Sequence, residues 1–160
     1  MEQSEFLAAA EKYKDMLFRI ALNYFGNTYD ADDMVQDVLV KLYINRKPFE
    51  SEEHLRAWLI RVTVNTCKNT LRMPWRKKQV ALEELSATLS FEQPEQSELF
   101  QSVMSLPEKH RMVLYLFYYE DLTVKQIAGV LKLSETAVTT RLNRSRNLLK
   151  KNLTEVWKDE

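Results

Sequence analysis

Apolar residues recur every three or four positions through most of the chain, the spacing that places them on one face of an α-helix. No stretch shows the sustained alternation of apolar and polar residues that is typical of a half-buried strand. Only two glycines and four prolines interrupt the pattern. The sequence therefore predicts an all-α protein, with helices over about residues 4–25, 29–45, 51–72, 95–105 and 108–119, and two more within 123–150.

Capping residues mark several of the predicted helix ends. Ser4 and Ser51 favour a helix N-cap, Gly26 is a typical C-terminal stop, and Pro107 suits a first turn. The run from Met112 to Tyr119 is too apolar to be exposed. The other apolar stripes predict further core residues: Phe6, Leu7, Ala10, Tyr13, Leu17, Ile20, Ala21, Tyr24, Ala31, Val35, Val38, Leu42, Leu55, Trp58, Leu59, Val62, Leu99, Val103 and Leu106.

The segment 79–95 separates the chain into two parts. It is acidic, weakly periodic and broken by Pro94, which is typical of a linker with at most one short helix. We therefore expect two small helical domains, a bundle over residues 1–78 and a second domain over residues 96–160.

Residues 123–150 have the pattern of a helix-turn-helix. Thr123 and Gln126 can form a capping box, Leu133 can plug the turn, and Ser134 can cap the second helix. Between Lys132 and Lys151 there are six basic residues and one acid. This pattern predicts a second helix that enters the DNA major groove, with phosphate contacts and contacts to base edges. The alternative is a helical hairpin with an ordinary solvated basic face. The candidate DNA-binding residues are Thr136, Thr139, Thr140, Arg141, Asn143, Arg144 and Arg146.

The helix predicted over residues 29–45 carries a second, mixed face. Asp32, Gln36, Leu39 and Tyr43 are spaced by four, three and four residues, and Asp33 lies beside them. Mixed acidic, amide, apolar and aromatic groups on one stripe are typical of a protein-docking surface. An acidic helix start that favours the helix dipole, followed by one more core edge, explains the same spacing.

The next predicted helix has a cationic stripe. Arg61, Asn65, Lys68 and Arg72 are spaced by four, three and four residues, and residues 73–78 add basic groups around Trp75. Cationic groups with amides and aromatics suit phosphates and unstacked bases. Core packing is the simpler interpretation of Trp58.

The net charge of zero hides a segregation of charge. Residues 54–78 hold seven bases and no acid, and residues 79–105 hold five acids and no base. Two basic blocks with an acidic spacer between them indicate two contacts with a polyanion.

Several other functions lack a sequence signal. Cys67 is the single cysteine, so no internal disulfide can form, and a reducing cytoplasm fits. His54 and His110 lie far apart without a second ligand at metal spacing, and both are expected at the surface. No stretch is long enough for a membrane span, no secretory signal pattern starts the chain, and no nucleophile or phosphate-loop motif is present. We therefore expect no catalysis, no cofactor and no membrane insertion.

Two stretches together resemble the extracytoplasmic-function group of bacterial sigma-70-type sigma factors. The first comprises DADDMVQDV at residues 30–38, Lys41-Leu-Tyr, and HLRAWLIRV at residues 54–62 through Asn65. The second comprises LPEKHRMVL at residues 106–114, DLTVKQIA at residues 121–128 and TTRLNRSR at residues 139–146. The order and spacing of these stretches match the family over most of the chain outside the linker.

The resemblance implies a subunit that gives core RNA polymerase its promoter choice. The helix over 29–45 would dock on the polymerase through Asp32, Asp33, Gln36, Leu39 and Tyr43. The loop and helix over 46–72, with Phe49 and Asn65, would meet the −10 element and capture a flipped base of the non-template strand. The helix-turn-helix would read the −35 element as duplex. An anti-sigma factor is a further implied partner.

The chain departs from the family pattern at several positions. Leu39 stands where an aromatic is common, Val64 where a basic residue is frequent, and Asn69 where an acid is frequent. Lys132 replaces the usual turn glycine, and Thr139-Thr140 replace a frequent Lys-Ser. A lysine can occupy that turn position at a cost of ~1 kcal/mol, so we expect the fold to persist while the promoter preference differs.

Two other functions fit parts of the same pattern. A conventional helix-turn-helix regulator would bind a palindromic duplex unaided and use residues 1–78 to dimerise or sense. An all-helical adaptor would bind proteins only and show no salt-dependent affinity for DNA.

Overall fold

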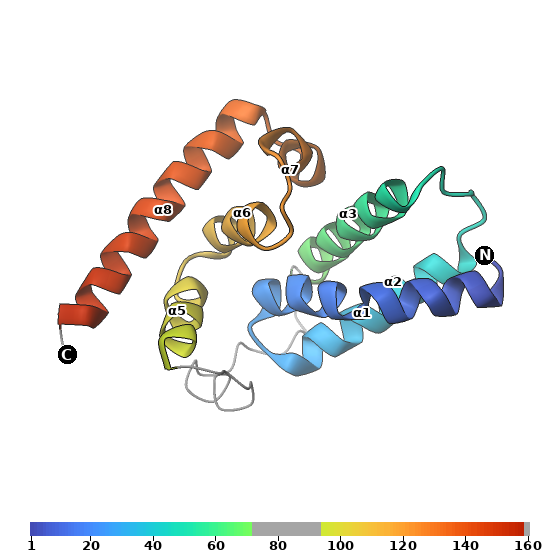
Figure 1. Ribbon diagram of the computed structural model, residues 1–160, viewed down its shortest axis with the longest axis horizontal. Coiled ribbons are helices and arrows are strands. Elements are labelled where there is room, and N and C mark those ends of the chain that lie inside the picture. Colours follow the sequence, from blue (N-terminus) through green and yellow to red (C-terminus); the bar gives the residue numbers. More distant parts are fainter. Residues whose placement is uncertain (72–93, 159–160) are drawn as a thin grey trace. The chain divides into compact units, whose positions relative to one another are not determined.

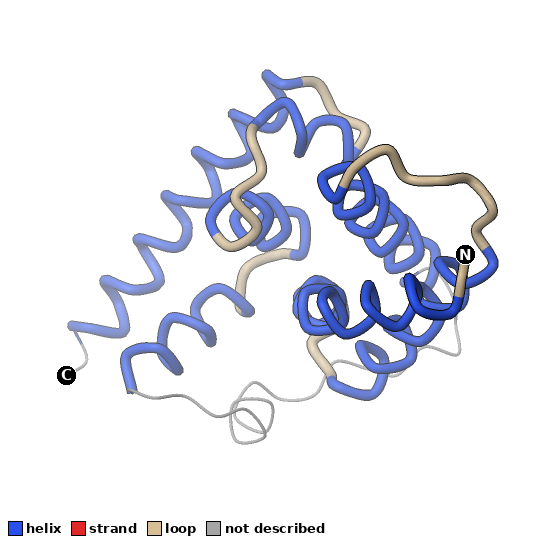
Figure 2. The backbone as a smooth tube through the Cα atoms, turned by 45° about the vertical axis from the view of Figure 1, so that its right-hand side comes forward, coloured by secondary structure: helices blue, strands red, loops and turns tan. Residues whose placement is uncertain are grey.

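The computed structural model of the chain describes residues 1–71 and 94–158. The chain forms two compact units, Met1–Gln79 and Val80–Glu160. Within the described residues all regular structure is helical (Figure 2). This agrees with the all-α class that the hydrophobic pattern predicts. None of the described helices is long and apolar enough to cross a membrane.

The first unit is built from three helices that pack pairwise, α1 (Gln3–Phe25), α2 (Thr28–Ile44) and α3 (Glu52–Leu71) (Figure 1). Each helix contributes apolar side chains to one shared core. The largest fully buried residues of this core are Leu17, Ile20, Phe25, Val38, Leu42, Leu59, Ile60 and Val64.

The turn between α1 and α2 is set by two adjacent residues. Gly26 adopts a left-handed conformation with φ 69°, and its N–H donates to the Leu22 carbonyl. Asn27 then caps α2, because its side chain accepts from the Asp30 N–H at 2.8 Å. Gly26 is thus the stop that the sequence predicts, since a residue with a Cβ is strained at this φ.

Ser4 does not cap α1 as predicted. The helix begins one residue earlier, at Gln3, and Ser4 lies inside its first turn. The N-cap is Glu2, whose side chain makes no capping hydrogen bond. The chain terminus is held instead by tertiary structure, because the Met1 ammonium donates to the Asn45 carbonyl just after α2 at 3.1 Å.

The buried faces of the first unit differ in part from the predicted stripes. Leu7 is 56% exposed, and Val35 is only half-buried while Met34 is buried. On α3, Trp58 and Val62 are half-buried. α3 contacts both α1 and α2, so its buried face is wider than one stripe. The additional buried residues of α3 are Ile60, Thr63, Val64, Thr66 and Cys67.

The second unit contains α5 (Pro94–Met104), α6 (Glu108–Tyr118), α7 (Val124–Leu131) and α8 (Glu135–Lys158). The long helix α8 contacts all three others (Figure 1). The buried apolar residues of the unit are Met104, Leu106, Met112, Val113, Leu114, Tyr115, Leu116, Leu122, Ile127, Ala128, Val130, Leu131, Val138 and Leu142. α8 continues to Lys158, beyond the predicted end at Lys150.

Two predictions about the second unit are wrong in detail. The apolar run of α6 is buried only as far as Leu116, whereas Tyr118 and Tyr119 are 55% and 67% exposed. These two residues lie at the end of the helix, where it is less covered by its neighbours. On α5, Leu99 is 39% exposed, and Ser102 and Met104 are buried in its place.

Most of the predicted linker lies outside the described residues, as do Arg72 and the basic segment around Trp75. Pro94 and Glu95, at the end of that predicted segment, already belong to α5.

Candidate nucleic-acid and protein-binding surfaces

The helix-turn-helix of α7 and α8 is fixed by local hydrogen bonds. Thr123 Oγ1 accepts from the Gln126 N–H at 3.1 Å, and Gln126 Oε1 accepts from the Thr123 N–H at 2.9 Å. This is the predicted capping box. At the start of α8, Ser134 Oγ accepts from the Ala137 N–H at 3.0 Å, which confirms Ser134 as the cap.

Lys132 makes the turn between the two helices. It ends α7 in the left-handed conformation, with φ 57° and ψ 48°, and its N–H donates to the Ala128 carbonyl. The next residue, Leu133, also donates to that carbonyl, at 3.0 Å, and its side chain is half-buried. The turn therefore forms without the glycine that such a conformation usually favours.

All seven candidate DNA-binding residues of this unit lie on the N-terminal half of α8. Thr136, Thr139, Thr140, Asn143 and Arg144 are exposed, and Arg141 and Arg146 are half-buried. The Thr139 hydroxyl donates to the Glu135 carbonyl at 3.0 Å, so its hydrogen is directed into its own helix. The polar and cationic candidates thus follow one another along a single helix, with Arg146 turned toward α6.

Arg146 is held by neighbours on two helices. Its Nε donates to the Tyr118 hydroxyl at 2.7 Å, and a terminal nitrogen donates to Asn143 Oδ1 at 3.1 Å. The guanidinium carbon also lies 5.4 Å from the Phe117 ring centroid and 5.6 Å from that of Tyr118. Sequence reasoning missed Tyr118, because the whole apolar run of α6 indicates a core.

His110 lies beneath α8 and not at the surface as predicted. It is 8% exposed, and its Nδ1 lies 2.9 Å from Ser145 Oγ. Burial lowers the pKa of His110, and the positive charges of Lys109 and Arg141 lower it further. The sequence feature that indicates this burial is the three-residue spacing between His110 and the apolar Val113, which places both on one face of α6.

Two further buried charged residues organise the second unit. The Arg111 guanidinium donates to the Met104 and Leu106 carbonyls, which satisfies groups at the end of α5. The Tyr115 hydroxyl donates to the Glu120 carboxylate at 2.6 Å. Both Arg111 and Glu120 are 5% exposed, so they serve the packing of this unit.

The mixed face of α2 is largely accessible. Asp32, Asp33 and Gln36 are exposed, Tyr43 is 51% exposed, and Leu39 is half-buried. Four of these five residues are thus accessible, and Leu39 is partly covered. The Tyr43 ring meets Phe6 of α1 edge to face at 5.2 Å.

Two apolar residues outside the predicted set extend this side of α2. Val40 and Ile44 are 58% and 66% exposed. Both are apolar residues at helical positions roughly opposite the inward stripe of the helix, where polar residues are usual, and that pattern indicates them in the sequence.

The loop before α3 is organised around Phe49. Its half-buried ring meets His54 edge to face at 5.3 Å and Trp58 at 5.5 Å. Ser51 caps α3 as predicted, because its Oγ accepts from the His54 N–H at 3.1 Å. His54 Nδ1 in turn accepts from the Glu50 N–H.

The cationic stripe of α3 is described as far as Lys68. Arg61 is exposed, and Asn65 and Lys68 are half-buried on the same helix. Thr66, which is not part of the stripe, accepts a hydrogen bond from Lys41 of α2 at 2.9 Å. The fourth predicted member, Arg72, lies outside the described residues.

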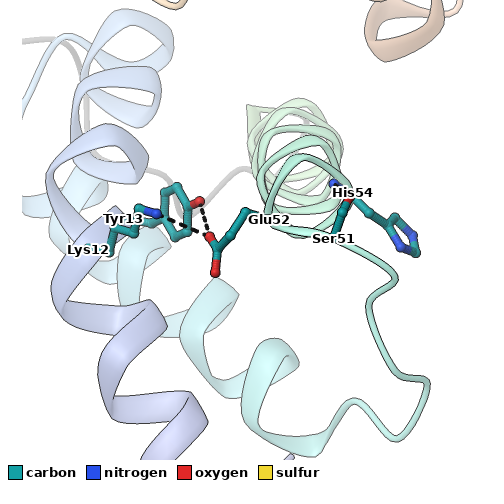
Figure 3. A network of polar contacts seen from close by, with 5 residues as sticks. All are labelled: Lys12, Tyr13, Ser51, Glu52 and His54. Carbon is teal, nitrogen blue, oxygen red and sulfur yellow. Dashed lines mark hydrogen bonds and ion pairs between the residues drawn. The ribbon is translucent and has the colours of Figure 1, made fainter.

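A polar cluster ties the start of α3 to α1 (Figure 3). The Tyr13 hydroxyl donates to Glu52 Oε2 at 2.7 Å, and Lys12 Nζ donates to the same oxygen at 3.2 Å. These hydrogen bonds lower the pKa of Glu52. Burial raises the pKa of Tyr13, and its hydrogen bond to Glu52 raises it further.

The described residues contain no group of three or more His, Cys, Asp or Glu side chains that could hold a metal ion.

Comparisons with known proteins match both units of the chain. The family model of sigma-70 region 2 matches residues 9–77, and that of sigma-70 region 4 matches residues 97–149. The RNA polymerase sigma factor YlaC of Bacillus subtilis is 30% identical, over 87% of this chain and 88% of its own length. The ECF RNA polymerase sigma factor SigW of the same organism is 24% identical, over 97% and 92%.

Two solved structures share the fold. The sigma factor RpoE of Bartonella quintana, in complex with the anti-sigma factor NepR, has a TM-score of 0.73 at 19% identity and covers 94% of this chain and 97% of its own. CnrH, in complex with the cytosolic domain of CnrY, has a TM-score of 0.66 at 24% identity and covers 96% and 90%. The chain belongs to the sigma-70 family of RNA polymerase sigma factors, in its extracytoplasmic-function group.

Proposed function

We propose that this sigma factor divides its work between three surfaces, one for core RNA polymerase and two for promoter DNA. The observation that carries the proposal is the pairing of region 2, at residues 9–77, with region 4, at residues 97–149, in one chain. In this role the chain acts as a transcription initiation factor in the cytoplasm and itself catalyses no reaction.

The polymerase surface lies on α2. Asp32, Asp33, Gln36 and Tyr43 are exposed, and half-buried Leu39 lies between them. A central apolar and aromatic group within a polar rim is the usual composition of a protein interface. The exposed Val40 and Ile44 enlarge the apolar part of this surface.

The −10 surface comprises the loop before α3 and the cationic stripe of α3. The edge-to-face contacts of Phe49 hold an aromatic ring near the start of the helix. Stacking on such rings stabilises unpaired bases whatever their identity. Asn65 supplies an amide, and Arg61 and Lys68 supply charge for phosphates, with Arg72 continuing the stripe in sequence.

The −35 surface is the exposed side of α8. Thr139, Thr140, Asn143 and Arg144 read bases, while Arg141 and Arg146 hold phosphates. Because the Thr139 hydroxyl donates within its own helix, its methyl group is suited to a thymine methyl. Thr136 lies nearest the N-terminus of α8, the end of a recognition helix that approaches DNA.

An inhibitory protein is a further partner that we propose. The two solved structures with this fold are complexes, one of a sigma factor with an anti-sigma factor and one of CnrH with the cytosolic domain of CnrY. By analogy, we propose that an anti-sigma factor binds this chain and competes with the polymerase or the promoter.

Gel filtration with core RNA polymerase tests the polymerase surface. We expect the wild-type chain to co-elute with the core enzyme, and the triple variant Asp32→Ala/Gln36→Ala/Tyr43→Ala to elute separately. Glu11→Ala/Lys14→Ala is the matched control, since it removes an exposed ion pair from α1. Circular dichroism of all three proteins establishes that the helices are retained.

The outcome also separates the alternatives. A folded wild-type chain that never co-elutes contradicts the proposal and favours a stand-alone regulator, which should bind a palindromic duplex without polymerase. Co-elution of the triple variant contradicts only the assignment of α2.

A further inference from the structure

Tyr118, Arg146 and Asn143 form a continuous hydrogen-bonded chain on the surface of the second unit. Tyr118 ends α6, and the other two residues lie three apart on α8. The Arg146 guanidinium stands between them, with contacts of 2.7 Å to the Tyr118 hydroxyl and 3.1 Å to Asn143 Oδ1. These hydrogen bonds therefore connect α6, which lies outside the helix-turn-helix, to Asn143 of α8.

The direction of these hydrogen bonds follows from chemistry. A guanidinium has five N–H donors and no acceptor, so the oxygen of Tyr118 and that of Asn143 must both accept. The Asn143 amide is consequently oriented with its oxygen toward Arg146. Its NH₂ group, the donor end, is the part left to meet a ligand of α8.

Ring contacts add to the two hydrogen bonds that hold the guanidinium in this position. Arg146 as a whole is half-buried, both hydrogen bonds are exposed, and the guanidinium carbon lies 5.4 Å and 5.6 Å from the Phe117 and Tyr118 ring centroids. Contacts of this kind attract a cation to an aromatic face and add to the hydrogen bonds. Arg146 is thus suited to orient Asn143 through a fixed fork, a task for which lysine lacks the planar geometry.

We propose that Tyr118 and Arg146 set the base specificity of Asn143, so that Asn143 selects a G·C pair in the −35 element. This inference rests on the proposed function of α8. Asparagine usually reads adenine by accepting from N6 and donating to N7, which requires both ends of the amide. Here one lone pair of the oxygen already accepts from a cation, and an adenine amino group that used the second lone pair would approach that same positive charge.

Guanine avoids this conflict. Its major-groove edge presents two acceptors, O6 and N7, and no donor. Both acceptors suit an amide NH₂ with a guanidinium beside it. Tyr118 and Arg146 are in this proposal positioning residues, and Asn143 is the residue that touches the base.

Transcription from a promoter library tests the proposal. The holoenzyme is formed from the full chain and core polymerase, and each −35 position is varied in turn. Asn143→Ala identifies the position that Asn143 reads, because the base preference there should disappear. The wild-type protein should prefer G·C at that position.

Two variants then test the positioning residues. Tyr118→Phe removes the acceptor for Arg146, and Arg146→Lys keeps the charge but loses the fork. Each should shift the preference from G·C toward A·T at that position by about fivefold or more, a factor within the discrimination of one good base contact. Preferences at other positions should not change. Tyr119→Phe is the matched control, because it alters a neighbouring exposed tyrosine whose ring stacks on Tyr115.

Three results overturn the inference. They are a wild-type preference for A·T at the position read by Asn143, no position that responds to Asn143→Ala, or an unchanged preference for G·C at that position in Tyr118→Phe and Arg146→Lys. Failure of the proposed function is distinguishable, since a wild-type holoenzyme would then not form or not transcribe any member of the library.

Discussion

The imidazole of His110 on α6 lies 2.9 Å from the hydroxyl oxygen of Ser145 on α8. Ser145 Oγ donates its single hydrogen to the Arg141 carbonyl at 2.6 Å. The Ser145 hydroxyl thus lies between the His110 ring and the backbone of α8. This contact joins α8 to α6 through an imidazole whose pKa is lowered by burial.

The first prediction follows from the lowered pKa of His110. Well above pH 6.5, the ordinary value, the residue is neutral in both the folded and the unfolded state. As the pH falls below that value, the unfolded chain binds a proton before the folded chain does, so the free energy of unfolding decreases. The decrease stops once the pH is below the pKa of the folded state. Urea unfolding of the full chain between about pH 8 and pH 5 measures this decrease in the free energy of unfolding.

A pair of histidine variants isolates this effect. His110→Gln should reduce the loss of stability between neutral and mildly acidic pH, and it should also lower the stability under mildly alkaline conditions. His54→Gln alters an exposed histidine of the first unit and should retain the wild-type pH dependence. Equal pH dependence in wild type and His110→Gln would show that His110 is not responsible.

The second prediction concerns the turn between α7 and α8. Lys132 adopts φ 57°, a conformation that costs a residue with a Cβ roughly 1 kcal/mol. The only nearby glycine, Gly129, is not at this turn but in the interior of α7, where glycine destabilises a helix. A Cβ built on Gly129 meets no atom within 4 Å. Gly129→Ala should therefore raise the free energy of unfolding by about 0.5–1 kcal/mol through helix propensity.

Lys132→Gly is the companion variant. It should leave stability unchanged or raise it by up to about 1 kcal/mol, because relief of the strained φ opposes the greater entropy of the unfolded chain. Urea unfolding at neutral pH measures both variants. A loss of stability in Gly129→Ala would contradict the open surroundings of that residue.

Helix boundaries were predictable where short-range chemistry decides them. Gly26, Ser51, Thr123 and Ser134 all act as the sequence indicates, because each bonds to a backbone group within four residues. Ser4 is not a cap, because the helix already begins at Gln3. A hydrogen bond from Met1 to the distant Asn45 carbonyl accompanies this earlier start. Local signals thus determine most of these helix ends.

Burial was less predictable, because it depends on which neighbours cover a helix. α3 is covered by two helices, so residues such as Val64 are buried although the single predicted stripe excludes them. His110 is buried because Ser145, 35 residues away, offers a partner. The link from Tyr118 to Arg146 likewise joins residues 28 apart. No spacing within one helix reveals such a contact.

The third prediction concerns the link between α1 and the loop that carries Phe49. Tyr13 is buried and donates to Glu52 at the start of α3, so it holds one end of this loop. Tyr13→Phe should reduce promoter opening roughly threefold, the factor expected for one net hydrogen bond. Permanganate reactivity of −10 thymines in the holoenzyme measures opening.

A pre-melted promoter provides the control for this third prediction. If Tyr13 acts by placing the loop, a promoter with an open −10 bubble should restore the activity of Tyr13→Phe. Lys14→Ala alters the adjacent exposed ion pair with Glu11 and should open promoters normally. Unchanged opening by Tyr13→Phe would mean that the loop does not depend on this hydrogen bond.

The last prediction separates the two kinds of DNA contact through their dependence on salt. Arg61→Ala removes a proposed phosphate contact, so it should weaken every promoter similarly and reduce the slope of log K against log salt by about 0.7–0.9 units. Arg144→Ala removes a proposed base contact, so it should cost ~1–3 kcal/mol on promoters with the preferred −35 base and much less on others. Because both residues are exposed arginines, the two variants carry the same change of charge. Holoenzyme binding to two promoters at several salt concentrations distinguishes them, and unchanged promoter ranking with Arg144→Ala would remove Arg144 from the base-reading set.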